Sequence, residues 1–158
     1  MFETILVPLD GSGLAEEALS VADELKSKFS SRVILLRSVE SASHHLVQAP
    51  GVFESPAAAV ANVELIQKMT QAEQSEARAY LEAVRTRLGG GSEVEALIVE
   101  GEAADAIVDT ADEHHASLIV MSSHGRGGLG RLVFGSVADA VLHRSHVPVL
   151  LIRLEERS

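Results

Sequence analysis

The sequence predicts an α/β fold, in which helices cover both faces of a five-stranded, mostly parallel sheet. Five short apolar runs alternate along the chain with segments whose apolar residues recur every three or four positions, as on one helix face. The runs are mostly continuous, which is typical of parallel strands buried on both sides. The chain has 158 residues, the length of one domain, and we expect a single domain over 1–158.

The first part of the chain supplies two strands and one helix. The first strand is predicted over 4–9, and Asp10 with the neighbouring glycines ends it. Ser12 suits the N-cap of the following helix. The predicted inward face of that helix consists of Ala15, Ala18, Leu19, Ala22, Leu25 and Phe29. The second strand is predicted over 32–38, and residues 41–56, with their prolines and clustered serines, are expected to form a loop.

The rest of the chain repeats this alternation. A long helix is predicted over 58–88, and the sequence leaves open whether it is broken once before the glycines that end it. The predicted inward face of its second half consists of Ala77, Leu81, Val84 and Leu88. The remaining elements are expected to be a strand over 93–99, a helix over 102–115, a strand over 118–121, a short helix over 136–144 and a strand over 147–153.

We expect the strand order 3-2-1-4-5, with right-handed crossovers. In open parallel sheets, ligands bind beyond the carboxyl ends of the strands, where the strand order reverses. With strands one and four as neighbours, the loops over residues 8–13 and 122–135 line one crevice. Asp10 is therefore predicted to face the second loop, and the crevice is the candidate binding site.

The loop after the fourth strand is rich in glycine. Four glycines stand within six positions: Gly125, Gly127, Gly128 and Gly130. Glycines let the backbone turn successive N–H groups inward. The free N–H groups of the helix that starts near Ser136 add a positive dipole end. Strand, glycine-rich loop and helix N-terminus together indicate a phosphate site, for which Arg126 and Arg131 could supply positive charge.

Two well-known phosphate motifs do not fit this loop. Gly125, Gly127 and Gly130 have the spacing of the dinucleotide fingerprint, but the 158-residue chain leaves room for only one further strand after them. Gly130 and Gly135 have the spacing of a P-loop, but no lysine precedes Ser136 to neutralise the phosphate. The loop therefore indicates a phosphate or nucleotide without either motif.

The stretch from Met121 onward, MSSHGRGGLGRLVFGSVA, and the later VPVLLIR resemble the C-terminal signature of the universal stress protein family. The opening ILVPLDGS resembles the first strand and loop of that family, so the resemblance covers essentially the whole chain. It implies a Rossmann-like, adenine nucleotide alpha hydrolase-like fold. ATP-binding members carry Gly-x2-Gly-x9-Gly-[Ser/Thr]. Gly125, Gly135 and Ser136 match this motif, whereas Ser122 replaces its first glycine.

The resemblance also implies roles for single residues. Pro8 and Asp10 lie at the floor of the site, with Asp10 near the ribose or a metal, and Ser38 offers its backbone to the adenine. Met121 and Ser122 lie beside the base and the ribose. The residues implied to surround the phosphates are Gly125, Arg126, Gly127, Gly128, Gly135, Ser136 and Val137. We expect His124 to belong to the loop scaffold, and the implied ligand is ATP, with Mg²⁺ as its accompanying ion.

Several of these residues also have simpler interpretations. Asp10 could only cap a local turn, and Ser136 could only be an N-cap. At position 122, the Cβ could crowd the ribose or phosphates, or the hydroxyl could donate to the ligand. The adjacent histidine pairs at 44–45 and 114–115 are expected to be solvated, because neighbouring side chains diverge.

Composition excludes several classes of protein. The net charge of −10 argues against non-specific nucleic-acid binding, and the absence of cysteine excludes disulfides and thiolate metal sites. No apolar run approaches the roughly 20 residues of a membrane span, and the N-terminus lacks the basic segment of a signal peptide. We therefore expect a cytoplasmic protein without a nucleic-acid or membrane partner.

The expected function is that of an ATP-binding regulatory protein of the stress response. Hydrolysis should be slow or absent, because the crevice offers Asp10 and backbone donors but no committed base. The alternative is a stress-response scaffold without nucleotide, in which Ser122 marks a lost site and dimer contacts carry the function. A small-molecule enzyme is least favoured. We expect a homodimer through the apolar edge strand Val147–Arg153.

Overall fold

The computed structural model describes residues 1–41, 55–124 and 135–154. In chain order the elements are β1 (Thr4–Pro8), α1 (Gly13–Phe29), β2 (Arg32–Val39), α3 (Pro56–Arg87), β3 (Val94–Glu100), α4 (Ala103–Glu113), β4 (Leu118–His124), α5 (Ser136–Arg144) and β5 (Val149–Leu154). Within these ranges, no helix combines the length and the hydropathy needed to cross a membrane.

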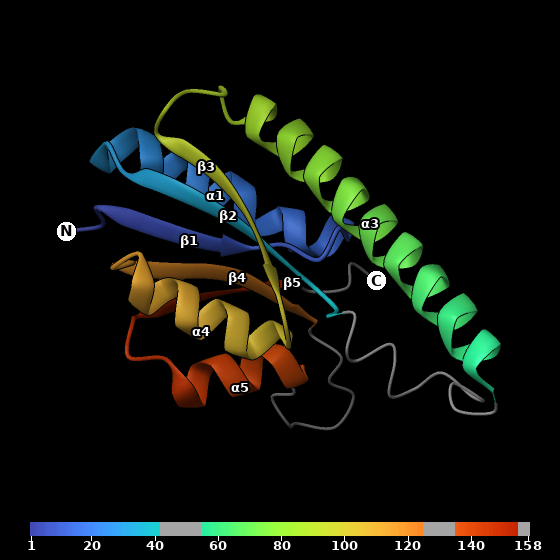
Figure 1. The fold of residues 1–158 in the computed structure, drawn as a ribbon. Coiled ribbons are helices and arrows are strands. Elements are labelled where there is room, and N and C mark those ends of the chain that lie inside the picture. Colours follow the sequence, from blue (N-terminus) through green and yellow to red (C-terminus); the bar gives the residue numbers. More distant parts are fainter. Residues whose placement is uncertain (42–54, 125–134, 155–158) are drawn as a thin grey trace.

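The five strands form one sheet in the order β3-β2-β1-β4-β5 (Figure 1). All of the pairings are parallel, so the predicted fold class and strand order are confirmed. β1 pairs with β2 on one side, and on the other side Ile5 and Leu6 pair with Leu118 and Ile119 of β4. The strand order therefore reverses between β1 and β4, as the predicted crevice requires.

Helices cover both faces of the sheet, with α1 and α3 on one face and α4 and α5 on the other (Figure 1). Successive strand residues point to opposite faces, so each buried strand serves two cores. The core under α1 and α3 includes Ile5, Val7, Val33, Leu81 and Val84. The core under α4 and α5 includes Leu6, Ile34, Ile107, Ile119 and Val141. Because side chains on both faces of each central strand are buried, the strands appear in the sequence as continuous apolar runs.

The N-cap of α1 is as predicted, whereas its last residue is not buried as predicted. The Ser12 hydroxyl accepts a hydrogen bond from the Ala15 N–H at 3.1 Å, which confirms the predicted N-cap. The prediction that Phe29 faces the core is wrong. Phe29 is the last residue of α1, its side chain is 47% exposed, and it packs edge-to-face on Phe2 with ring centroids 5.3 Å apart.

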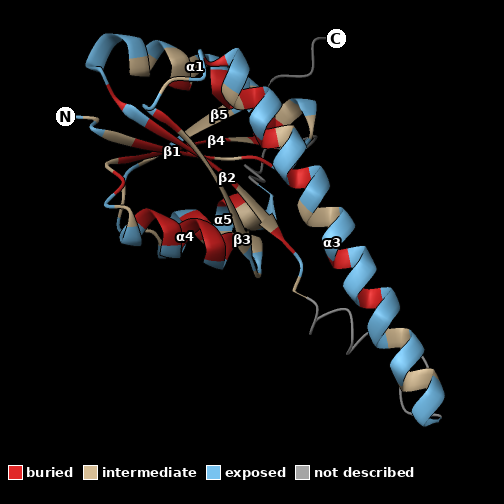
Figure 2. Cartoon of the chain, turned by 45° about the horizontal axis from the view of Figure 1, so that its top comes forward, coloured by how far each residue is buried: buried red, intermediate tan, exposed pale blue. Residues whose placement is uncertain are grey.

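α3 is one continuous helix of 32 residues, which answers the question of a break. Ser55 caps its first turn by accepting the Ala58 N–H, and Pro56 occupies a position where no N–H is needed. The predicted inward face of its second half is buried. The first half extends beyond the sheet (Figure 2). It carries four exposed apolar side chains, those of Val60, Val63, Leu65 and Met69.

The ends of β4 and β5 differ from the prediction. β4 continues to His124 rather than ending at Met121, because residues 122–124 still pair with residues 152–154 of β5. Apolar patterning does not indicate this extension, since its residues are polar. β5 begins at Val149, two residues after the predicted start, and Pro148, which has no N–H to donate to a ladder, precedes it.

Candidate functional site

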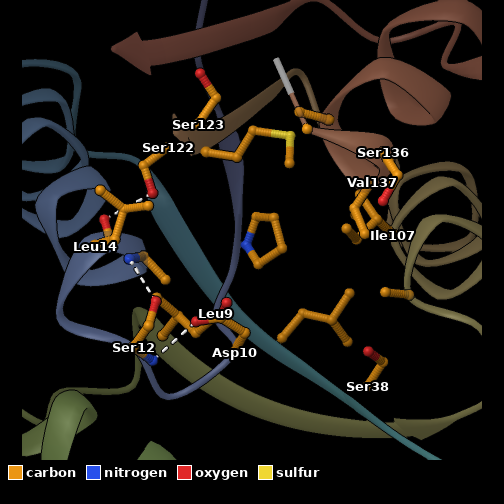
Figure 3. Close-up of a pocket in the computed structure, with 17 residues that line it drawn as sticks. Leu9, Asp10, Ser12, Leu14, Ser38, Ile107, Ser122, Ser123, Ser136 and Val137 are labelled. Carbon is orange, nitrogen blue, oxygen red and sulfur yellow. Dashed lines mark hydrogen bonds between the residues drawn. The ribbon is translucent and has the colours of Figure 1, made fainter. Parts of the chain in front are cut away.

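A cavity of about 270 Å³ lies beyond the carboxyl ends of β1 and β4, where the strand order reverses (Figure 3). Its volume is close to the lower end of small-molecule sites, about 300–1,000 Å³. Residues from both halves of the chain line it, so the fold assembles the crevice that the strand order predicts. The predicted site residues among its lining are Pro8, Asp10, Ser38, Met121, Ser122, Gly135, Ser136 and Val137.

The loop between β1 and α1 forms the floor of the cavity. The Leu9 N–H donates to the Leu36 carbonyl oxygen at 2.8 Å, which ties the start of the loop to β2. Asp10 Oδ1 accepts the Ser12 N–H at 2.8 Å, so the side chain closes the turn in which Gly11 adopts a φ of +85°. The interpretation of Asp10 as a turn-capping residue is therefore correct, and the same residue also lines the cavity.

Asp10 carries a negative charge at neutral pH. Burial alone would raise its pKa, but hydrogen bonds from the side chain and backbone of Ser12, together with the nearby Arg37 guanidinium, hold the pKa below its ordinary value. Among the described residues that line the cavity, Asp10 is the one carboxylate. A carboxylate with a lowered pKa suits a hydroxyl donor or a cation as its partner, and it is a weak general base.

Ser122 contributes to the structure through its hydroxyl. Ser122 Oγ donates to the Leu14 carbonyl oxygen at 2.7 Å, and this bond ties the end of β4 to the first turn of α1 (Figure 3). The Ser122 hydroxyl therefore already donates its proton within the protein. The hypothesis that this hydroxyl donates to a ligand lacks support. The side chain still lines the cavity. What a serine changes at this glycine position is the space taken by its Cβ.

The N-terminus of α5 opens onto the same cavity. Gly135 is its N-cap, with a φ of +84° and no capping side chain, and Ser136 is its first helical residue. The interpretation of Ser136 as the N-cap is therefore wrong by one position. Gly135 has no side chain to cap α5, and within the described part of the chain no side chain caps its first turn, so the first N–H groups suit an anion.

Apolar side chains form the rest of the lining. Leu36 of β2, Ile107 of α4 and Met121 of β4 are all buried residues of the core under α4 and α5. In Figure 3, Ile107 and Val137 lie across the cavity from Leu14 and Ser122. The cavity thus combines an apolar wall, one ionised carboxylate and a helix N-terminus, which is the composition expected of a site with few convergent polar groups.

Sequence reasoning missed several lining residues. Ala103 and Ile107 lie in α4, which follows β3, and a prediction of which helix covers each strand end could have found them. Ser123 was missed because β4 was predicted to be too short. It is 3% exposed, and its hydroxyl has no hydrogen-bond partner among the described residues.

The positions of five other predicted site residues relative to the cavity stay predictions. His124 is the last residue of β4. Gly125, Arg126, Gly127 and Gly128 lie outside the described residues. Within residues 1–41, 55–124 and 135–154, no three His, Asp or Glu side chains form a metal-binding cluster.

Comparison with known proteins identifies the family. The sequence pattern of the universal stress protein family matches residues 1–153. Universal stress protein MJ0531 of Methanocaldococcus jannaschii is 30% identical over 153 residues, which cover 97% of this chain and 83% of the relative. The chain therefore belongs to the universal stress protein family, as its sequence motifs indicate.

Solved structures agree with this assignment. The structure of the hypothetical protein MJ0577 has a TM-score of 0.77 at 27% identity, and the likeness covers 99% of both chains. The universal stress protein from Archaeoglobus fulgidus in complex with dAMP has a TM-score of 0.55 at 25% identity, and the likeness covers 96% of this chain and 98% of that one. The predicted Rossmann-like architecture is confirmed by these comparisons.

Proposed function

We propose that this protein binds ATP with Mg²⁺ in the cavity between β1 and β4, and that it acts as a nucleotide-dependent regulator in the stress response. The observation that carries the proposal is the meeting of three features in one cavity: an apolar wall, the ionised Asp10 and the uncapped N-terminus of α5. These features match the base, the ribose or its metal, and the phosphates of a nucleotide. The dAMP complex of the Archaeoglobus fulgidus relative supports the choice of an adenine nucleotide.

The residues present fit Mg²⁺ as part of the nucleotide rather than as a resident ion. Mg²⁺ usually binds through one or two carboxylates together with substrate phosphates and water. Asp10 supplies one ionised carboxylate at the cavity, and no preformed cluster of ligands exists among the described residues. Asp10 would therefore contact the ion only when the nucleotide is bound.

Hydrolysis is proposed to be slow or absent. An efficient general base has a pKa near the working pH, whereas the pKa of Asp10 lies below its ordinary value. The Ser122 hydroxyl donates its proton to the Leu14 carbonyl oxygen, so it cannot donate to a water molecule without giving up that bond. The site is therefore better suited to holding a nucleotide than to cleaving it. Regulation would then depend on whether nucleotide is bound, not on its hydrolysis.

The binding proposal is tested by thermal unfolding with ATP and Mg²⁺, ADP, AMP and adenosine, together with analysis of the purified protein for retained nucleotide. A ligand at 100 times its Kd should raise the melting temperature by about 5–10 °C. Val137→Trp should remove the shift by filling the cavity, because Val137 lines it. Leu142→Trp is the matched control, since Leu142 lies on the same helix, is exposed and is not a lining residue.

The absence of any shift and of any retained nucleotide would contradict the binding proposal. That result would favour the second candidate, a stress-response scaffold without nucleotide. One observation specifically favours this candidate, namely that a serine stands at the first glycine position of the motif and its Cβ takes up cavity space. A shift that persists equally in Val137→Trp would instead place the ligand elsewhere on the molecule.

We further propose that the protein is a cytoplasmic homodimer paired through β5 and the residues just before it. β5 is an edge strand of the sheet, and edge strands have unpaired backbone groups that invite pairing. Its Leu150 is 37% exposed, although it belongs to an apolar strand. A two-fold dimer would cover this edge in both copies.

A further inference from the structure

Arg37 lies next to the cavity without lining it. Its neighbours on β2, Leu36 and Ser38, are lining residues, but side chains alternate along a strand, so Arg37 points to the opposite face of the sheet. On that face its guanidinium carbon lies 5.4 Å from the centroid of the Tyr80 ring of α3. This distance is within the range of a cation–π contact, about 6 Å.

The same guanidinium packs against the floor loop of the cavity. A Cβ added to Gly11 would lie only 2.3 Å from Arg37 Nη1, so the guanidinium occupies the space beside the Gly11 backbone. Arg37 is also one of the charges that lower the pKa of Asp10. The loop is therefore supported by Arg37 from one side while Asp10 and Ser12 line the cavity.

The position of the Tyr80 ring, on which Arg37 stacks, is fixed by its own packing. The Tyr80 side chain is half-buried and packs against the core under α1 and α3. Near it, Arg87 Nη2 of α3 donates to Glu16 Oε2 of α1 at 2.9 Å. Burial, and next the negative charge of Glu16, raise the pKa of Tyr80. α3 is thus anchored beside the start of α1, where the floor loop ends.

We propose that Arg37 is a positioning residue of the nucleotide site: held by the Tyr80 ring, it supports Gly11 and so keeps Asp10 in the turn that faces the ligand. The role in the turn follows from the contacts of the ligand-free protein. Only the effect on the ligand rests on the proposed nucleotide binding. The inference links α3, which does not line the cavity, to the geometry of its floor.

The turn can be followed without any nucleotide through hydrogen exchange of the Ser12 amide, which donates to Asp10 Oδ1. Arg37→Met keeps most of the stem but removes the guanidinium, and it should make the Ser12 amide exchange about three to ten times faster. Arg32→Met is the matched control, because Arg32 lies on the same strand at its other end and pairs with Glu95. The control should leave Ser12 exchange unchanged.

Tyr80 provides a second matched pair. Tyr80→Phe keeps the ring and should leave the exchange of Ser12 as in the wild type, whereas Tyr80→Leu removes the ring and should resemble Arg37→Met. The amide of Val7, in the buried β1, serves as the internal reference for global opening. Unchanged Ser12 exchange in Arg37→Met, or an equal rise at Ser12 and Val7, would overturn the positioning role.

The effect on the site is measured by calorimetric titration with ATP and Mg²⁺. Arg37→Met should weaken binding about tenfold, since misplacement of a contact residue costs roughly one good hydrogen bond, and Arg32→Met should bind as the wild type does. Normal affinity in Arg37→Met despite faster Ser12 exchange would overturn the link to the ligand. If the wild type binds no nucleotide, the proposed function fails, and the exchange data still decide whether Arg37 positions the turn.

Discussion

Ser122 differs from the glycine of the motif in two ways: its hydroxyl bonds to the Leu14 carbonyl oxygen, and its Cβ takes up space at the cavity. Two substitutions separate these effects. Ser122→Ala removes the bond but keeps the Cβ, and it should lower the free energy of unfolding by about 1 kcal/mol while ATP binding is retained. Ser122→Gly should lower it by about 0.5–1 kcal/mol more, because glycine loses more freedom in a strand. Its nucleotide affinity should be equal or higher, since the Cβ is gone.

These two variants are compared by urea unfolding and by ATP titration of the same preparations. Ser122→Ala is the control for the hydroxyl and Ser122→Gly is the test for the Cβ. Loss of ATP binding in both variants would show that the hydroxyl contacts the ligand, against the geometry of the Leu14 bond.

Tyr80 predicts a pH dependence of stability. Burial, and next the carboxylate of Glu16, raise its pKa to about 12 from an ordinary value of 10.0. Between these values the unfolded chain loses the phenolic proton while the folded protein keeps it, so the stability that Tyr80 contributes is complete below pH 10 and is lost as the pH rises towards 12. The wild type should therefore lose stability relative to Tyr80→Phe as the pH rises from about 10 to about 12, measured by urea unfolding of both proteins across this range.

The titration can be observed directly, because Tyr80 is the one tyrosine of the chain and tryptophan is absent. The absorbance of its phenolate should appear well above pH 10, the ordinary value for tyrosine. Removal of the Arg37 charge should move this titration further upward, because that charge stabilises the phenolate. A titration near the ordinary value in the folded protein would contradict the raised pKa of Tyr80 and the burial that is its main cause.

At the scale of the elements, the N-terminus of α5 makes a prediction about which part of a nucleotide it holds. Gly135→Asp places a carboxylate at the N-cap, where it would compete with phosphate for the first N–H groups of the helix. ATP affinity should fall at least about tenfold through loss of a charge-assisted contact, while adenosine affinity should stay unchanged. Calorimetric titration with the two ligands gives the comparison.

Gly89→Asp is the matched control for Gly135→Asp. Both glycines have positive φ values, +96° for Gly89 and +84° for Gly135, and at either position a Cβ would meet no atom of the described residues within 4 Å. The control therefore carries the same backbone strain and the same added charge away from the cavity. Equal loss of ATP and adenosine binding in Gly135→Asp would show that the helix N-terminus does not hold the phosphates.

The elements differ in how well the sequence predicts them. Apolar periodicity predicts helices and buried strands because burial selects their residues, and it predicts the core face in the second half of α3 correctly. It fails at the end of β4, where residues 122–124 keep a strand by pairing with β5 although none of them is apolar. The exposed position of Phe29 has a related cause, since periodicity cannot indicate where the core beneath a helix ends.

At the scale of the whole molecule, the sequence predicts the crevice through strand order, and eight predicted residues line it. It does not predict the side of the cavity formed by Ala103 and Ile107, because contacts between α4 and distant strand ends have no local signal. It also does not predict the support by Arg37, which depends on a ring 43 positions further along the chain, that of Tyr80. A residue such as Arg37, which supports a site through contacts with distant residues, has no local sequence pattern that identifies it.

The proposed dimer is also tested at this scale. Leu150→Lys places a charge on the exposed side chain of the edge strand β5 and should shift sedimentation from dimer to monomer. Val60→Lys is the control, because Val60 is exposed on α3, a helix that packs on β2 and β3 at the opposite side of the sheet. A wild type that sediments as a monomer at high micromolar concentration would rule out pairing through β5.

The central position of β1 has a consequence for synthesis of the chain. β1 is made first, yet its partner β4 follows far along the sequence, as the contact between Thr4 and Ser117 at a separation of 113 residues shows. At typical elongation rates a ribosome needs on the order of ten seconds to reach that partner. During this time the β4 side of β1, which is apolar from Ile5 onward, has no native neighbour, so nascent chains that stop before Leu118 should depend on chaperones that bind exposed strands.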